Sequence, residues 1–226
     1  YTCMKLMGSL GHEQEDADDY AAWGVDFLKY DWCRYPSGTI EGAAATSRDD
    51  CRAAFTLMHK CLERTGRPIV YSMHDKCTAG TEQGALPWVK TIANMNRTGR
   101  DIRNNWGLMI YCLETTADLW QYAGPGYWND PDMLEVGNEH HSYKNEPVMN
   151  LTENRTHFSM WCMVAAPLIA GNDLRNMSPD IVKILTNKEV IALDQDPLGK
   201  QGRRIRDNGG REVWIKELSG NRMAVA

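Results

Sequence analysis

The sequence lacks the long apolar runs and the positive charge that would point to a membrane or a nucleic acid. No apolar stretch approaches the roughly 18 residues that a transmembrane helix needs, and 25 Lys and Arg are outnumbered by 30 Asp and Glu, for a formal net charge of -5. A mildly acidic surface disfavours nucleic-acid binding and favours a neutral or mildly polar ligand. We therefore expect neither a nucleic-acid partner nor a membrane partner.

Metal-ligand and phosphate-binding motifs are also absent. The seven cysteines are an odd number, and none stands in a C-x-x-C pair. The histidines show no metal-ligand spacing, and no glycine-rich phosphate loop follows any expected strand. We expect no metal and no cofactor.

The most informative stretch of the chain is 24–33, GVDFLKYDWC. Its apolar residues interleave with polar ones and predict a short buried strand, followed by a turn-rich loop. Side chains alternate along a strand, so Lys29 and Asp31 share one face, about 7 Å apart. A cation beside a carboxylate keeps the carboxylate ionised, as a nucleophile requires. A purely structural ion pair is the alternative for these two residues.

Expected strands and helices alternate along the chain. The strands end near Asp31, Met73, Asp101, Asp132 and Ala170. Acids and amides gather after the strands, where the active site of a barrel enzyme lies. The pattern predicts an α/β fold, namely a partial (β/α)8 TIM barrel of about five strand–helix units, with a doubly wound sheet as the alternative.

The expected helices cover 13–23, 48–65, a short piece within 81–93, 103–122, 153–164 and 178–187. For the second helix we predict Ser47 as the cap and Ala54, Leu57, Met58 and Leu62 as the buried stripe. The expected strands cover 24–33, 68–73, 124–134 and 165–169, and a strand end within 94–102.

The pattern changes near residue 190. Alternating residues such as Val213 and Ile215 predict antiparallel strands. We expect residues 1–190 to be the C-terminal part of a (β/α)8 barrel, and 191–226 to be a linker with the first strands of a C-terminal β-sandwich. We expect a longer protein around this segment. Alone, the segment would leave open sheet edges and would not act as an enzyme.

Five motifs in register now carry a family resemblance. They are KYDWC, RPIVYS, GPGYWNDPDML, APLIAGNDLRNMS and VIALDQDPLGKQG, spread over residues 2–201. Together they resemble the α-galactosidase and α-N-acetylgalactosaminidase family, glycoside hydrolase family 27. The resemblance implies a (β/α)8 barrel followed by a β-sandwich, and hydrolysis of terminal α-linked galactosides with retention of configuration.

The resemblance also implies roles for residues. Asp31 matches the nucleophile and Lys29 the lysine that binds sugar hydroxyls. The stretch NMNRTGRDI places Asp101 as acid/base and Arg97 as the residue that steers it. A retaining glycosidase needs two carboxyl groups about 5–5.5 Å apart, one ionised and one protonated, which agrees with these roles.

Two further features follow from the resemblance. Asp132, in WNDPDML, is expected to shape the sugar site, and it is the alternative acid/base. Cys3 and Cys33 match a family disulfide. The other five cysteines have no match, and we expect them to be buried free thiols.

The sequence departs from the family pattern after YS. Met73, His74 and Asp75 stand where a cysteine, a small or acidic residue and a tryptophan are usual. Asp75 or His74 would meet the sugar 2-position, which favours galactose over N-acetylgalactosamine. Trp32 either stacks on the sugar or packs internally. An α-N-acetylgalactosaminidase, a β-L-arabinopyranosidase and an inactive sugar-binding relative remain alternatives.

Four Asn-x-Ser/Thr sequons, at Asn96, Asn150, Asn154 and Asn176, favour a secreted, lysosome-like or vacuolar location. We expect the Asn96 sequon to be unused because it overlaps the expected site. The expected partner is a carbohydrate substrate, and a homodimer of the full-length protein is compatible with the resemblance.

Overall fold

The computed structural model describes residues 6–32, 48–74, 86–139 and 146–226. The chain divides into two compact units, residues 1–96 and 97–226. Cys3, Cys33, Ser47, Asp75 and Cys77 lie outside the described residues, so the predictions made for them stay predictions.

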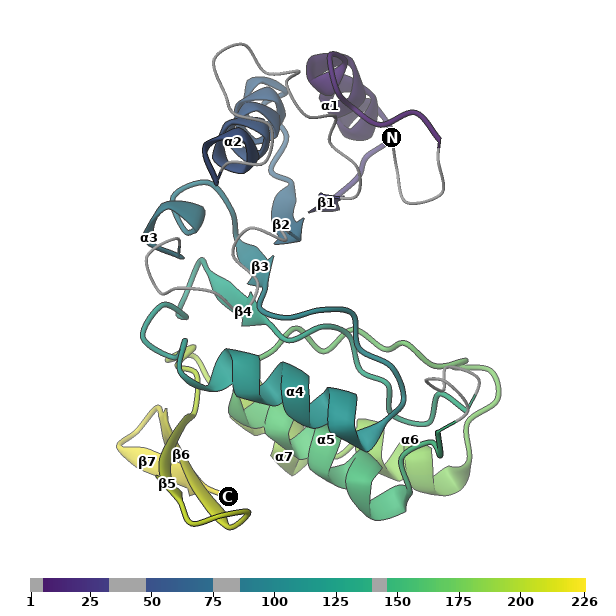
Figure 1. Ribbon diagram of the computed structural model, residues 1–226, viewed down its shortest axis with the longest axis vertical. Helices are drawn as coiled ribbons and strands as arrows, with labels where there is room; N and C mark the ends of the chain where they lie inside the picture. The colour runs from purple at the N-terminus through teal and green to yellow at the C-terminus, as the bar shows by residue number, and fades with distance from the viewer. Residues whose placement is uncertain (1–5, 33–47, 75–85, 140–145) are drawn as a thin grey trace. The chain divides into compact units, whose positions relative to one another are not determined.

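The first unit is a parallel sheet with helices. Its elements are α1 (Glu13–Ala22), β1 (Phe27–Asp31), α2 (Arg48–Arg64), β2 (Val70–His74), α3 (Leu86–Val89) and the start of β3 (Met95–Arg97). The strand β1 pairs in parallel with β2, from Phe27 opposite Val70 to Asp31 opposite His74. In turn, β2 pairs in parallel with β3. Figure 1 shows α1 and α2 on the same side of this unit, where Arg64 donates to Gln14 at 2.6 Å.

Helix α2 forms because one face is apolar. Its buried side chains are Cys51, Ala54, Phe55, Met58, Cys61 and Leu62. The predicted stripe is wrong at Leu57, which is 42% exposed. Positions 51, 55, 58 and 62 recur every three to four residues, and this places Leu57 beside the stripe. Gly66, with φ +72°, follows the helix end, where a glycine in the left-handed region commonly ends a helix.

The second unit begins with the last residue of β3 and contains two kinds of structure. Its further elements are α4 (Trp106–Ala117), β4 (Trp128–Asp130), α5 (Leu151–Met163), α6 (Pro179–Leu185), α7 (Lys188–Asp194), β5 (Arg203–Asp207), β6 (Glu212–Leu218) and β7 (Arg222–Val225). Thr98, next after β3, donates its N–H to the Asp130 carbonyl at 2.9 Å, beside β4. The last three strands form an antiparallel sheet in the order β5-β6-β7.

The core of the second unit lies around α5. Phe158 and Trp161 of α5 pack with Met109 of α4 and Trp214 of β6 in one buried cluster. The helix begins at a capping box, in which Asn150 accepts from the Glu153 N–H and Glu153 accepts from the Asn150 N–H. Burial of these apolar side chains holds α4, α5 and β6 together.

Several predicted boundaries differ from the structure. The predicted strand 165–169 is wrong: Ala165 has φ +55°, and only a single parallel bridge joins Ala170 to Leu134. Helix α4 is shorter than the predicted 103–122, because Asn105 caps it by accepting from the Leu108 N–H. Helix α7 was not predicted. It starts where Asn187 accepts from Glu189 and Val190.

Candidate active site

In the first unit the predicted nucleophile lies beside a histidine. Asp31 ends β1 and His74 ends β2, and these residues are register partners. The His74 Nδ1 lies 3.4 Å from the Asp31 Oδ2. The His74 side chain is only 6% exposed and that of Asp31 36% exposed. The carboxylate is therefore accessible at the C-terminal end of a parallel strand, with an imidazole fixed next to it.

The β1 residues alternate as predicted, but the prediction that this strand is buried is wrong, because its residues are exposed or half-buried and Phe27 is 40% exposed. Lys29 is exposed like Asp31, whereas Tyr30 is partly buried and its ring lies 5.7 Å from that of Phe55. Trp32 also packs on Phe55, with ring centroids 6.0 Å apart. Of the two roles considered for Trp32, internal packing is therefore observed, and stacking on a sugar stays a prediction.

In the second unit Arg97 joins two carboxylates. It ends β3 and its side chain is 1% exposed, while its Nη2 lies 2.6 Å from the Asp132 Oδ2 and 3.5 Å from the Asp101 Oδ1. The Asp101 side chain is 63% exposed. Asp101 stands four residues beyond β3, in a loop and not at the strand end that was predicted. The structure thus brings Arg97, Asp101 and Asp132 together.

Both carboxylate oxygens and the carbonyl of Asp132 accept hydrogen bonds from the protein. Its Oδ2 also accepts from the Ile102 N–H at 2.9 Å, and its Oδ1 accepts from the Met133 N–H at 2.8 Å. Its own N–H donates to Asp130 Oδ1 at 2.8 Å, and its carbonyl accepts from the indole of Trp161 at 2.7 Å. The exposed Asp101 is therefore better placed than Asp132 to meet a substrate.

Two buried residues of α5 support this region and were missed by sequence reasoning. The Trp161 ring meets that of His157 edge to face at 4.1 Å. His157 Nε2 accepts from the Glu135 N–H at 3.0 Å. Complete burial lowers the His157 pKa to about 3, so the ring is neutral. In the sequence both residues are part of a helical apolar face and carry no separate signal.

Buried charge is also found where α7, α5 and β6 meet. The Lys216 Nζ donates to the Cys162 carbonyl at 2.8 Å. Burial lowers the pKa of Lys216 and raises that of Asp194 to about 6. Burial likewise raises the pKa of the Cys162 thiol to about 12, so this thiol is unreactive. Cys61, Cys112 and Cys162 are buried free thiols, as predicted, and Cys51 is buried as well.

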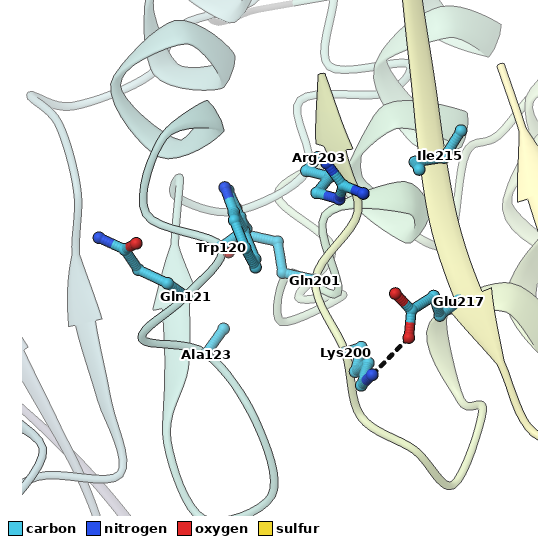
Figure 2. A pocket seen from close by; sticks show the side chains of 8 residues that line it. All are labelled: Trp120, Gln121, Ala123, Lys200, Gln201, Arg203, Ile215 and Glu217. Atoms are coloured by element: carbon cyan, nitrogen blue, oxygen red, sulfur yellow. Dashed lines mark hydrogen bonds and ion pairs between the residues drawn. The ribbon is translucent and has the colours of Figure 1, made fainter. Parts of the chain in front are cut away.

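A cavity of about 210 Å³ is lined by residues of the second unit. Figure 2 shows the Trp120 indole and the Arg203 side chain in this lining, and the ion pair that Lys200 makes with Glu217. The Arg203 guanidinium lies 5.5 Å from the Trp120 ring centroid. None of the predicted site residues lines this cavity.

The described part of the chain holds neither a metal-binding cluster nor a membrane-spanning helix. Within residues 6–32, 48–74, 86–139 and 146–226, no three His, Cys, Asp or Glu side chains gather as a metal site would require. The helices described in the same ranges include none that is both long enough and apolar enough to span a bilayer.

Comparison with known proteins identifies the family. The family model described as alpha galactosidase A matches residues 1–196. The chain belongs to this family. It is 42% identical over 238 residues to alpha-galactosidase 3 of Arabidopsis thaliana, covering 100% of this chain and 47% of that protein. It is 42% identical over 225 residues to the alpha-galactosidase of Cyamopsis tetragonoloba, covering 99% of this chain and 49% of that protein.

A solved structure agrees with the family assignment. Alpha-galactosidase I from Mortierella vinacea superposes with a TM-score of 0.82 at 32% identity, covering 97% of this chain and 56% of that one. The parallel strands and the separate antiparallel sheet, together with this similarity, confirm the predicted fold class of a partial (β/α)8 barrel followed by the first strands of a β domain. The chain spans about half the length of the curated relatives it matches. The domain boundary at residue 190 stays a prediction.

Proposed function

We propose that the intact protein is a retaining glycoside hydrolase that cleaves terminal α-linked galactose. The observation that carries the proposal is Arg97, a buried cation that joins the exposed Asp101 carboxylate to the fixed Asp132 directly after a parallel strand. Asp31 ends another parallel strand with its carboxylate exposed. Membership of the alpha galactosidase A family supports the same reaction.

The proposed reaction uses two displacements. The Asp31 carboxylate attacks the anomeric carbon while Asp101 donates a proton to the glycosidic oxygen, and the aglycone leaves as an alcohol. Asp101, now a carboxylate, takes a proton from water, and the water oxygen displaces Asp31 from the anomeric carbon. Two inversions release α-galactose. Arg97 holds Asp101 in place, and Lys29 binds sugar hydroxyls in this proposal.

The test is to replace each carboxylate in the intact protein. Asp31→Asn and Asp101→Asn should each remove at least about 99% of the activity on raffinose, because each takes part directly in bond making or proton transfer. Asp26→Asn and Asp173→Asn are the controls, since both aspartates are exposed and pair with the surface-accessible arginines Arg67 and Arg175. Azide added to Asp31→Gly should give a β-galactosyl azide. Unchanged turnover in Asp31→Asn would exclude the proposal.

We propose galactose as the preferred sugar. His74 is buried beside Asp31 and fills space near the reacting carbon. A panel of aryl α-galactoside, α-N-acetylgalactosaminide and β-L-arabinopyranoside substrates distinguishes α-galactosidase activity from the two alternative activities. Binding of galactose without turnover of any of them would instead indicate an inactive sugar-binding relative.

We also propose that the protein enters the secretory route, for secretion or for a lysosome-like or vacuolar compartment. Asn176 supports this, because it is an exposed residue within an Asn-Met-Ser sequon. Asn96 and Asn154 are buried, at 1% and 4% exposure, and are unsuited to carry a glycan. A mobility shift on deglycosylation that Asn176→Gln removes would support the proposal, and its absence after expression in a eukaryotic host would oppose it.

A homodimer of the intact protein is proposed on the family resemblance alone. Light scattering of the purified protein tests it directly, and a monomer mass at micromolar concentration would exclude it.

A further inference from the structure

Trp161 is tied to the candidate active site by one buried hydrogen bond. Its side chain is 0% exposed, and its Nε1–H donates to the Asp132 carbonyl at 2.7 Å. The ring cannot turn freely, because His157 packs against it edge to face at 4.1 Å. The indole therefore presents its N–H in one fixed direction, toward the backbone of Asp132.

The backbone of Asp132 needs such support. Its φ of +94° lies in the left-handed region, which is unfavourable for a residue with a Cβ. Strained residues of this kind persist only where the surroundings fix them, and they cluster at functional sites. Here the Asp132 N–H is held by Asp130 Oδ1 at 2.8 Å and its carbonyl by Trp161.

The Asp132 carboxylate in turn fixes the loop that carries Asp101. Its Oδ2 accepts from the N–H of Ile102, the residue directly after Asp101, at 2.9 Å. The same oxygen lies 2.6 Å from the Arg97 Nη2, which lies 3.5 Å from Asp101. Asp132 thus contacts the loop of Asp101 in two ways, through a backbone amide and through a shared arginine.

We infer that Trp161 is a positioning residue for the acid/base Asp101, acting through Asp132. It does not touch the substrate in this role. This inference rests on the proposed function, in which Asp101 protonates the leaving group. Loss of the indole N–H frees the strained Asp132 peptide, and the Ile102 and Arg97 contacts shift with it. A displacement of about 1 Å at a catalytic group can lower a rate about 100-fold.

The test compares two matched tryptophan variants of the intact protein. Trp161→Phe removes the N–H to Asp132, whereas Trp214→Phe removes an equally short bond, from Trp214 Nε1 to Glu212 Oε2 at 2.7 Å, on β6. Both rings are buried in the same core, so the two variants lose similar apolar packing. If Trp161→Phe folds poorly, 3-benzothienylalanine at position 161 keeps the bicyclic shape and replaces only the N–H with sulfur.

The deciding readout is the dependence on the leaving group. A misplaced general acid matters most when the departing alcohol needs a proton. Trp161→Phe should therefore lower kcat/KM, which reports the first displacement, about 10- to 100-fold on raffinose and less than about threefold on a dinitrophenyl galactoside. Asp101→Ala should show a larger difference between the losses on the two substrates, and Trp214→Phe should show no difference.

Each result bears on one claim. An equal loss of kcat/KM on both substrates, or a Trp161→Phe enzyme that matches Trp214→Phe, would overturn the positioning role while the wild-type activity leaves the proposed function intact. A wild-type protein without activity on either galactoside would overturn the proposed function itself.

Discussion

His74 and Asp31 face each other across two parallel strands, with the imidazole Nδ1 3.4 Å from the carboxylate Oδ2. The family pattern has a small or acidic residue at the position of His74. The bulk of the ring is thus placed next to the carboxylate expected to attack the sugar.

Sugar preference should depend on this ring. His74→Ala opens space beside Asp31, and we expect the preference for the aryl galactoside over the aryl N-acetylgalactosaminide, measured as the ratio of kcat/KM values, to fall about tenfold or more. His59→Ala is the control, because His59 lies on the partly exposed side of α2 and pairs with Glu63. An unchanged ratio would mean that His74 does not face the 2-position.

Arg97 should matter for stability as well as activity. Arg97→Met leaves the nearly buried Asp132 carboxylate without its cation, and breaking such a buried pair costs about 3–5 kcal/mol. The free energy of unfolding from urea titrations measures this loss. Arg175→Met removes an exposed, solvent-screened pair and should change the free energy of unfolding far less. Similar losses of unfolding free energy in Arg97→Met and Arg175→Met would contradict the argument that the Arg97–Asp132 pair is buried.

His157 should make the protein less stable in acid. Its pKa is about 3 when folded, well below the ordinary 6.5, so the unfolded chain takes up a proton first as the pH falls. Its contribution to stability is complete above about pH 6.5 and is lost progressively from there toward pH 3. His157→Gln should reduce the pH slope of the unfolding free energy in this window by up to about one proton. His12→Gln, at an exposed site, should not reduce that slope.

Asp194 should lower the stability of the protein as the pH rises, which is opposite to the effect of His157. Burial raises the folded pKa of Asp194 to about 6 from the ordinary 3.8, so the folded protein binds the extra proton between these values. This group therefore lowers stability as the pH rises from about 4 to about 6. Asp194→Asn should remove that decline and be more stable than wild type at pH 7, by at most about 3 kcal/mol. Asp207→Asn, at an exposed site, should change neither the decline of stability between pH 4 and 6 nor the stability at pH 7. An Asp194→Asn protein less stable than wild type at pH 7 would contradict the argument.

The parts of the fold that follow from local pattern were predictable. The helices around Ala17 and Met58 have regular apolar spacing and alternate with short strands, so the α/β class could be predicted, and Asp31 stood out at the end of one expected strand. The roles of Arg97 and Asp101 came from the family resemblance. The short strand lengths could not be predicted, because they depend on side chains that bond the following backbone, as Asp130 Oδ1 does when it accepts from the Asp132 N–H directly after β4. The supporting roles of His157 and Trp161 on α5 were missed. In sequence, a helix face predicts only a buried core, and it carries no sign that one of its rings also supports a functional loop.

The hydrogen bonds that join the helices to the antiparallel strands bear on how this segment can be exchanged between relatives. Lys216 of β6 donates to the last turn of α5, the Gly202 N–H donates to Met163, and the Gln201 amide donates to the end of α4 at Thr116. A recombination point at residue 190 would take these donors from one parent and their acceptors from the other, and a parent that lacks the Lys216 or Gln201 side chain would leave a buried carbonyl unpaired. Chimeric enzymes should therefore fold better when the helices from α4 onward and the strands through β6 come from the same parent.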